Sequence, residues 1–126
     1  MIGRAEALFY HSELIRRFGG SDGVRDEGIL DAALNRPYAT FDGTDLFPTA
    51  MEKAAAMLHG IITGHPFVDG NKHTGYVLAR LILQDGGVAP LASEDGKYDL
   101  VILVATGKVQ VEGVQAWMRE RVRSMK

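Results

Sequence analysis

The chain has 126 residues, of which 46% are hydrophobic and 24% charged, with a formal net charge of −2. These proportions are typical of an ordinary globular protein, and the weak charge argues against direct nucleic-acid binding driven by electrostatics. The absence of cysteine excludes disulfide scaffolds, thiolate zinc sites and cysteine nucleophiles. No signal-peptide pattern and no run of ~20 apolar residues occurs, so we expect a cytoplasmic single domain over residues 1–126, without membrane contact.

Apolar residues at helical spacing predict two helices at the start of the chain. The first covers residues 4–18 and stops at a Gly-Gly pair. Its apolar positions are Leu8, Phe9, Leu14, Ile15 and Phe18. The second covers about 26–35, with Asp26 as its N-cap. Residues 36–48 have no helical period and contain Asp-Gly, which predicts an irregular loop or a small hairpin, and a loop of this length is more often functional than idle.

Three or four further helices follow. Pro48 suits the first turn of a helix that ends at Gly64. The next, 71–85, has little polar face and is expected to be the central buried helix. The apolar run in 98–107 fits a buried strand or a helix, and the Ser-Glu-Asp before it favours a helix. A last helix is predicted over 111–123, so the expected fold class is all-α.

The densest polar cluster is HPFVDGNKHTG, residues 65–75, between two of these helices. A helix N-terminus has about four unpaired backbone N–H groups and a partial positive charge. Gly70 would let a phosphate approach the backbone, and Asn71 and Lys72 would add side-chain donors. Asp69 would repel a bare phosphate unless it holds a divalent cation that the phosphates also bind.

His65 lies just before this turn, where an imidazole can act as a general base. Together these residues suit an enzyme that transfers a phosphate-containing group. Taken singly, each has an ordinary structural interpretation: a loop residue for His65, a turn or cap residue for Asp69 and Asn71, a solvated helix residue for Lys72. Phe67 is expected to be a core anchor. The joint occurrence of the polar residues is what indicates a site.

HPFVDGNK resembles the active-site motif of the Fic/Doc family, which reads His-Pro-Phe-x-Asp/Glu-Gly-Asn, then Gly or Lys, then Arg. The similarity extends to RFGGSDGVRDEGILDAALNRPYATFDG, EKAAAMLHGIITGHPF and ATGKVQVEGVQAWMRE, and so to nearly the whole chain. The short length and Lys72, where adenylylating relatives carry glycine, favour the Doc-type toxins. The resemblance implies a compact helical bundle with a central buried helix and a small β-hairpin flap near the active site.

The family also implies an activity. Most Fic proteins transfer AMP from ATP to a target hydroxyl, whereas Doc-type toxins phosphorylate a threonine of elongation factor Tu and stop translation. Carried over to the matching positions, His65 would take the proton from the hydroxyl and Asp69 would bind Mg²⁺. The backbone around Gly70, with Asn71 and Lys72, would hold the phosphates of ATP.

The resemblance further implies partners. The flap, 36–47, would pair with the target chain by adding a strand, with Tyr38, Thr40 and Phe41 as contacts or, equally, as packing residues. The self-inhibitory pattern of many Fic proteins, Ser/Thr-x-x-x-Glu-Gly/Asn, does not occur in this sequence. A Phd-like antitoxin acting in trans is therefore expected to restrain the protein, docking on the N-terminal helix or on the flap.

One position of the motif departs from the family pattern, because His73 stands where an arginine is expected. An imidazole is shorter than a guanidinium and lacks its fixed two-pronged phosphate contact, which costs about 2–4 kcal/mol of transition-state stabilisation. The change is a natural weakening, a natural retuning to another donor, or an introduced substitution. It also makes a nucleotide- or protein-binding module without chemistry an alternative to the enzyme. AMP transfer stays an alternative to phosphorylation. A metal-dependent hydrolase using His59, His65, Asp69 and His73 is a further alternative, without an HExxH-like signature.

Overall fold

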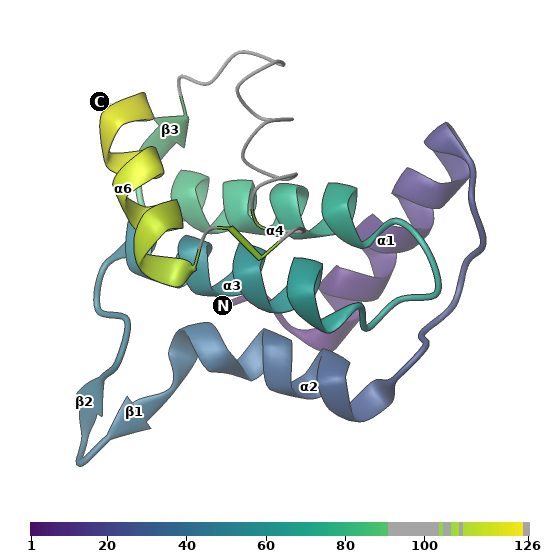
Figure 1. Cartoon of the computed structure of the whole chain (residues 1–126), viewed down its shortest axis with the longest axis horizontal. Coiled ribbons are helices and arrows are strands. Elements are labelled where there is room, and N and C mark those ends of the chain that lie inside the picture. Colours follow the sequence, from purple (N-terminus) through teal and green to yellow (C-terminus); the bar gives the residue numbers. More distant parts are fainter. Residues whose placement is uncertain (91–103, 105–106, 109, 125–126) are drawn as a thin grey trace.

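A computed structural model describes residues 1–90, 104, 107, 108 and 110–124. The molecule is mostly helical (Figure 1), and its described residues form two very small antiparallel sheets. In chain order the elements are α1 (Arg4–Phe18), α2 (Glu27–Asn35), the 3-10 helix η1 (Arg36–Tyr38), β1 (Thr40–Phe41), β2 (Thr44–Asp45), α3 (Ala50–Gly64), α4 (Asn71–Asp85), β3 (Val88–Pro90), α6 (Val111–Arg121) and β4 (Val122–Ser124). The all-α prediction is confirmed, while the helix expected over 98–107 falls almost wholly outside the described residues.

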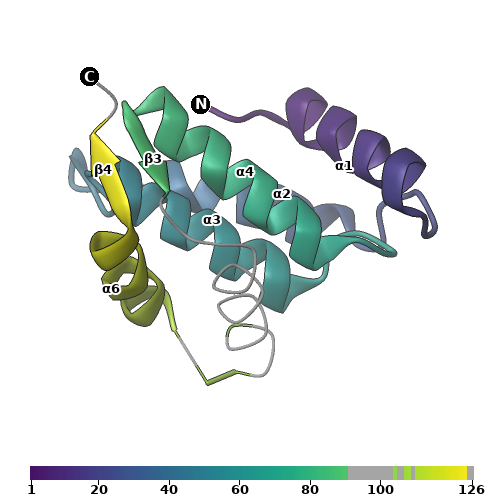
Figure 2. The same ribbon diagram turned by 90° about the horizontal axis from the view of Figure 1, so that it is seen from above.

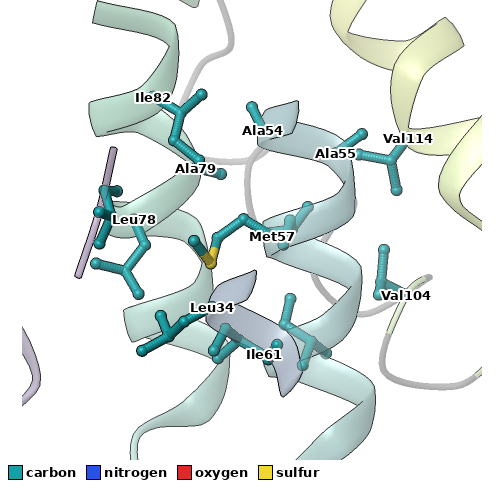
Figure 3. Packing of buried hydrophobic residues seen from close by; sticks show 14 of the residues in the cluster. Leu34, Ala54, Ala55, Met57, Ile61, Leu78, Ala79, Ile82, Val104 and Val114 are labelled. Atoms are coloured by element: carbon teal, nitrogen blue, oxygen red, sulfur yellow. The ribbon is translucent and has the colours of Figure 1, made fainter. Parts of the chain in front are cut away.

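Helix α3 lies at the centre of the bundle. It packs against α4 on one side and α6 on another, and α2 covers it from a third direction; α1 packs on the outer side of α4 (Figure 2). In Figure 3, Met57 of α3 points toward Leu78 of α4, whereas Ala55 points toward Val114 of α6. The fully buried positions of α3 are Ala54, Ala55, Ala56, Met57, Leu58, Ile61 and Ile62.

The expectation that residues 71–85 form the central helix was therefore wrong. Helix α4 is the second most enclosed element, and it keeps an exposed edge at Arg80, Gln84 and Asp85. The alanines of α3 explain the difference, because small side chains on every face let neighbouring helices approach it closely. The run of large apolar residues in 77–83 suggested α4, and these residues lie toward α3.

Local signals set the helix boundaries. The Asp26 side chain accepts a hydrogen bond from the Ile29 N–H at 2.9 Å, so it is the N-cap of α2 as predicted. Helix α3 begins with a capping box in which Thr49 and Glu52 bond each other's backbone N–H groups. Pro48 thus precedes the cap and is not in the first turn, a correction to the sequence prediction.

Helix α1 has the predicted bounds but a different buried face. Its fully enclosed residues are Ala7 and His11, whereas Phe9 and Phe18 are 60% and 68% exposed. A histidine thus replaces a hydrophobic residue at the centre of the contact between α1 and the rest of the bundle.

The two sheets are short. The predicted hairpin is present as β1–β2, with Thr40 paired to Asp45 across a turn in which Asp42 and Gly43 both have positive φ. The β3–β4 pair was not predicted, and it forms because the chain leaves helix α6 after Arg121 and pairs with the strand following α4. None of the described helices is both long and apolar enough to cross a membrane.

Candidate active site

The connection between α3 and α4 forms a tight loop, residues 65–70, at one end of the bundle (Figure 1). His65 ends α3 in the left-handed conformation, with φ 51° and ψ 54°, and Gly70 precedes α4 with φ 75°. A cavity of about 280 Å³ opens at this loop and at the first turn of α4. It is lined by His65, Val68, Asp69, Gly70, Asn71, Lys72 and His73. The structure thus brings together all the predicted site residues of the 65–73 motif.

The first turn of α4 presents backbone donors to this cavity. Thr74 N–H donates to the Gly70 carbonyl at 3.0 Å, which is the first backbone bond of the helix, so the N–H groups of Asn71 and Lys72 precede its hydrogen-bond ladder. Lys72 is exposed beside them. The helix dipole, the N–H groups at the start of the helix and the Lys72 ammonium group together favour an anion at this end of α4.

The side chain of Asn71 has a role that differs from the prediction. It is only 8% exposed, its Oδ1 accepts from Phe67 N–H at 2.9 Å, and its Nδ2 donates to the Phe67 carbonyl at 3.0 Å. These two bonds join the Asn71 side chain to the Phe67 backbone and so close the loop. The Asn71 amide therefore holds the loop in shape, and what it offers a ligand is its backbone N–H.

Gly70 also has a structural reason that the sequence did not reveal. A Cβ at this position would lie 3.1 Å from the Ile15 Cδ1 and 3.6 Å from the His11 Nε2. Side chains of α1 therefore fill the space beside the glycine. Its positive φ and this close packing, and not only the approach of a ligand, require glycine here.

Asp69 is exposed, and its carboxylate is held in place by two backbone donors. Oδ1 accepts from Gly70 N–H at 3.0 Å and Oδ2 from Ser21 N–H at 3.3 Å. A carboxylate has about four lone-pair positions, so it can still bind a cation. Such a single exposed carboxylate beside an anion site fits Mg²⁺, which usually takes one or two carboxylates together with substrate phosphates and water.

A metal centre built from protein ligands alone is not favoured. Among the described residues no group of three or more His, Cys, Asp or Glu side chains could hold a metal ion. His59 instead lies near the Arg36 guanidinium, with 3.4 Å between Nδ1 and Nη1. Burial and then the Arg36 charge lower the pKa of His59 from its ordinary value. These observations count against the metal-dependent hydrolase.

His73 is half-buried on the first turn of α4 and lines the cavity. Its ring lies 4.8 Å from the exposed ring of Phe18, at an interplanar angle of 51°. The end of α1 thus contacts the residue that replaces the family's arginine.

Residues 21–26, which we call the bracing segment, run along the loop from the other side. Val68 N–H donates to the Gly23 carbonyl at 3.0 Å, and the N–H groups of Arg25 and Asp26 donate to the Pro66 carbonyl at 2.7 and 3.1 Å. The Arg25 guanidinium donates from Nε to the His65 carbonyl at 2.6 Å and from Nη2 to the Gly64 carbonyl at 2.9 Å. The sequence contains no local signal for these contacts, because they join residues about forty positions apart.

His11 supports the loop from α1. Its ring is 1% exposed and stacks on Phe67 with 3.9 Å between ring centroids and 7° between planes. Nε2 lies 2.7 Å from the Asp69 carbonyl oxygen, and Nδ1 lies 3.3 Å from Oδ1 of Asp22. A histidine on the inner face of an amphipathic helix was the available sequence signal, and it was missed.

The hairpin does not contribute to this cavity. Tyr38 is half-buried and its hydroxyl accepts from the Ile2 N–H at 3.1 Å, while Thr40 and Phe41 are exposed on β1. Lys53, near the start of α3, bonds the Phe47 carbonyl and the Asp45 carboxylate. The hairpin is therefore fixed at the opposite end of α3, about 22 Å from the loop for a helix of 15 residues (Figures 1 and 2).

A helix N-terminus that faces a cavity, with a histidine and a carboxylate beside it, defines a candidate site for transfer of a phosphate-containing group. The model of the Fic/DOC family matches residues 2–83. The chain is 42% identical over 102 residues to the Toxin Doc of Mycolicibacterium smegmatis, covering 79% of this chain and 78% of that protein. It is 34% identical over 121 residues to the Protein kinase doc of Escherichia phage P1, covering 94% and 92%. The chain belongs to the Fic/Doc family.

Proposed function

We propose that the protein is a Doc-type toxin, an ATP- and Mg²⁺-dependent transferase that phosphorylates a protein hydroxyl. The observation that carries this proposal is the cavity at the N-terminus of α4, which is lined by His65, Asp69 and Lys72 together with the first turn of the helix. The two relatives, one named a toxin and the other a protein kinase, support the same function. A threonine of elongation factor Tu is the expected acceptor, so that translation would stop and the site of action would be cytoplasmic.

In this reaction the phosphates of ATP occupy the anion site. His65 takes the proton from the acceptor hydroxyl while the hydroxyl oxygen forms a bond to the γ-phosphorus of ATP. The bond between that phosphorus and the β,γ-bridging oxygen breaks, which releases ADP. Asp69 is the residue that would hold Mg²⁺, which supplies charge neutralisation of the phosphates when bound. His73 occupies the place of an always-charged phosphate contact, and we expect it to lower the rate.

The test is incubation of the purified protein with elongation factor Tu, Mg²⁺ and ATP, read by intact mass. A gain of one phosphoryl group, absent with His65→Ala and faster with His73→Arg, is the expected result. A gain in mass of one AMP would instead show that the protein is an adenylyltransferase. If both versions bind nucleotide and neither modifies the target, the binding module that His73 suggests becomes the better description.

A Phd-like antitoxin in trans is part of the same proposal. The exposed Phe9 and Phe18 on α1, and Phe41 on the hairpin, are the apolar residues that such a partner could cover. The hairpin would contact the target or the antitoxin at a distance from the transfer site. A pull-down of the tagged protein from its native host tests this expectation, and it would be contradicted if no small partner were recovered.

A further inference from the structure

Arg25 makes a contact that the proposed function does not explain. Its guanidinium donates to the carbonyl oxygens of Gly64 and His65, the last residue of α3 and the residue that ends it. The side chain reaches them from the bracing segment, 39 and 40 residues earlier in the chain. Resting on the proposed function, we propose that Arg25 is a positioning residue that holds His65 in its working conformation.

The backbone of His65 needs such support. A φ of 51° belongs to the left-handed region, which residues with a Cβ adopt uncommonly, although histidine, like asparagine and aspartate, is found there more often than most. His65 N–H donates to Ile61 O at 3.2 Å, which continues the helix up to this residue but does not hold its carbonyl. The Arg25 Nε donates to that carbonyl at 2.6 Å, and so fixes the peptide plane that follows His65.

Position and charge both favour this role. The carbonyl groups at a helix C-terminus carry partial negative charge and have no partners within the helix, so a guanidinium that bonds two of them is stabilised there. The backbone N–H of the same residue donates to Pro66 at 2.7 Å. Arg25 thus bonds three consecutive carbonyls, those of residues 64–66, and sets the direction in which the chain turns at His65.

The consequence concerns the imidazole. His65 is exposed and lines the cavity, so its side-chain direction depends mainly on its own backbone. If the left-handed conformation is lost, the imidazole moves away from the acceptor hydroxyl while the donors of α4 stay in place. Loss of Arg25 should therefore lower kcat and leave the affinity for nucleotide unchanged.

Arg25→Ala tests this, with Arg16→Ala as the matched control. Both arginines are exposed, and Arg16 bonds Glu13 within α1 instead of the loop. We expect Arg25→Ala to lower kcat about 10- to 100-fold, the effect of a small misplacement of a reacting group, with the Kd for Mg²⁺·ATP unchanged. Methylguanidinium added to Arg25→Ala should restore part of the rate, and it should not do so for His65→Ala. Arg25→Lys, which can bond one carbonyl at a time, should be intermediate.

A second readout does not depend on turnover. The three-bond coupling between the His65 amide and α protons, with its Cα chemical shift, reports φ and should change in Arg25→Ala but not in Arg16→Ala. Unchanged values at His65, or a kcat equal to that of Arg16→Ala, would overturn the proposal. If the unmodified protein transfers nothing to any acceptor, the proposed function fails, and the NMR comparison alone decides whether Arg25 holds His65.

Discussion

The two hydrogen bonds between Asn71 and the Phe67 backbone give a sharp prediction about stability. Asn71→Ala removes both, at 2.9 and 3.0 Å, and leaves a buried N–H and a buried carbonyl without these partners. Each lost bond of this kind costs about 1–3 kcal/mol, so the free energy of unfolding should fall by about 2–6 kcal/mol. Small proteins are stable by about 5–15 kcal/mol, so the variant should lose a large part of its stability.

Urea unfolding, compared at the linear extrapolation to water, measures this loss. Lys72→Ala is the control, because the adjacent side chain is exposed and its removal should change the unfolding free energy by less than about 0.5 kcal/mol. Asn71→Asp should not restore the stability, since it opposes the Phe67 carbonyl with another oxygen. If Asn71→Ala is as stable as the Lys72 variant but binds ATP more weakly, the amide serves the ligand and the structural reasoning is wrong.

Three further measurements address the backbone of the loop, the packing at the end of α4, and the pH dependence of stability. His65→Gly should abolish transfer but raise the free energy of unfolding by about 0.5–1 kcal/mol, because relief of the left-handed strain exceeds the added chain entropy. The control Arg80→Gly, within α4, should lower the free energy of unfolding by about 0.5–1 kcal/mol, and equal losses for the two variants in urea would refute the argument. Gly86→Ala should lower the unfolding free energy by about 1–3 kcal/mol, seen as a lower Tm, since its Cβ would collide with Ala50, and an unchanged Tm would contradict that packing. Burial lowers the pKa of His59 below its ordinary 6.5, so protonation of this side chain favours unfolding and the free energy of unfolding should decrease as the pH falls below about 6.5. This decrease with pH should be smaller in His59→Gln, and an equal decrease in the variant would refute the argument.

Local chemistry explains which parts of the fold the sequence predicted. The bounds of α1 and α4 and the cap of α2 depend on residues within a few positions of each helix end, and these were read correctly. The β3–β4 pair depends on residues more than thirty positions apart, and no local pattern indicated it. The central position of α3 likewise depends on how closely its partner helices approach its alanines, and the pattern of large apolar residues in a single helix does not show this.

The same distinction applies to the candidate site. The spacing within 65–73 indicated correctly that these residues would gather at a helix N-terminus. It did not indicate that the Asn71 amide would be used within the loop, since an amide can bond a phosphate or a backbone equally well. Nor did it reveal the contacts of Arg25 and His11, because these come from segments that reach the loop only after the bundle has formed.

The division of roles within the loop explains how His73 can replace an arginine without loss of the fold. The groups that fix the loop, namely the Asn71 amide, the His11 ring and the bracing segment, bond its backbone on sides other than the cavity. Lys72 and His73 line the cavity at the start of α4, whereas Thr74, Gly75 and Leu78 are buried. The contacts of Asn71, His11 and the bracing segment do not involve the His73 side chain, so a change at position 73 alters what the cavity offers an anion while those contacts are kept. Phosphate affinity and this part of the loop geometry are thus separately variable properties of the site.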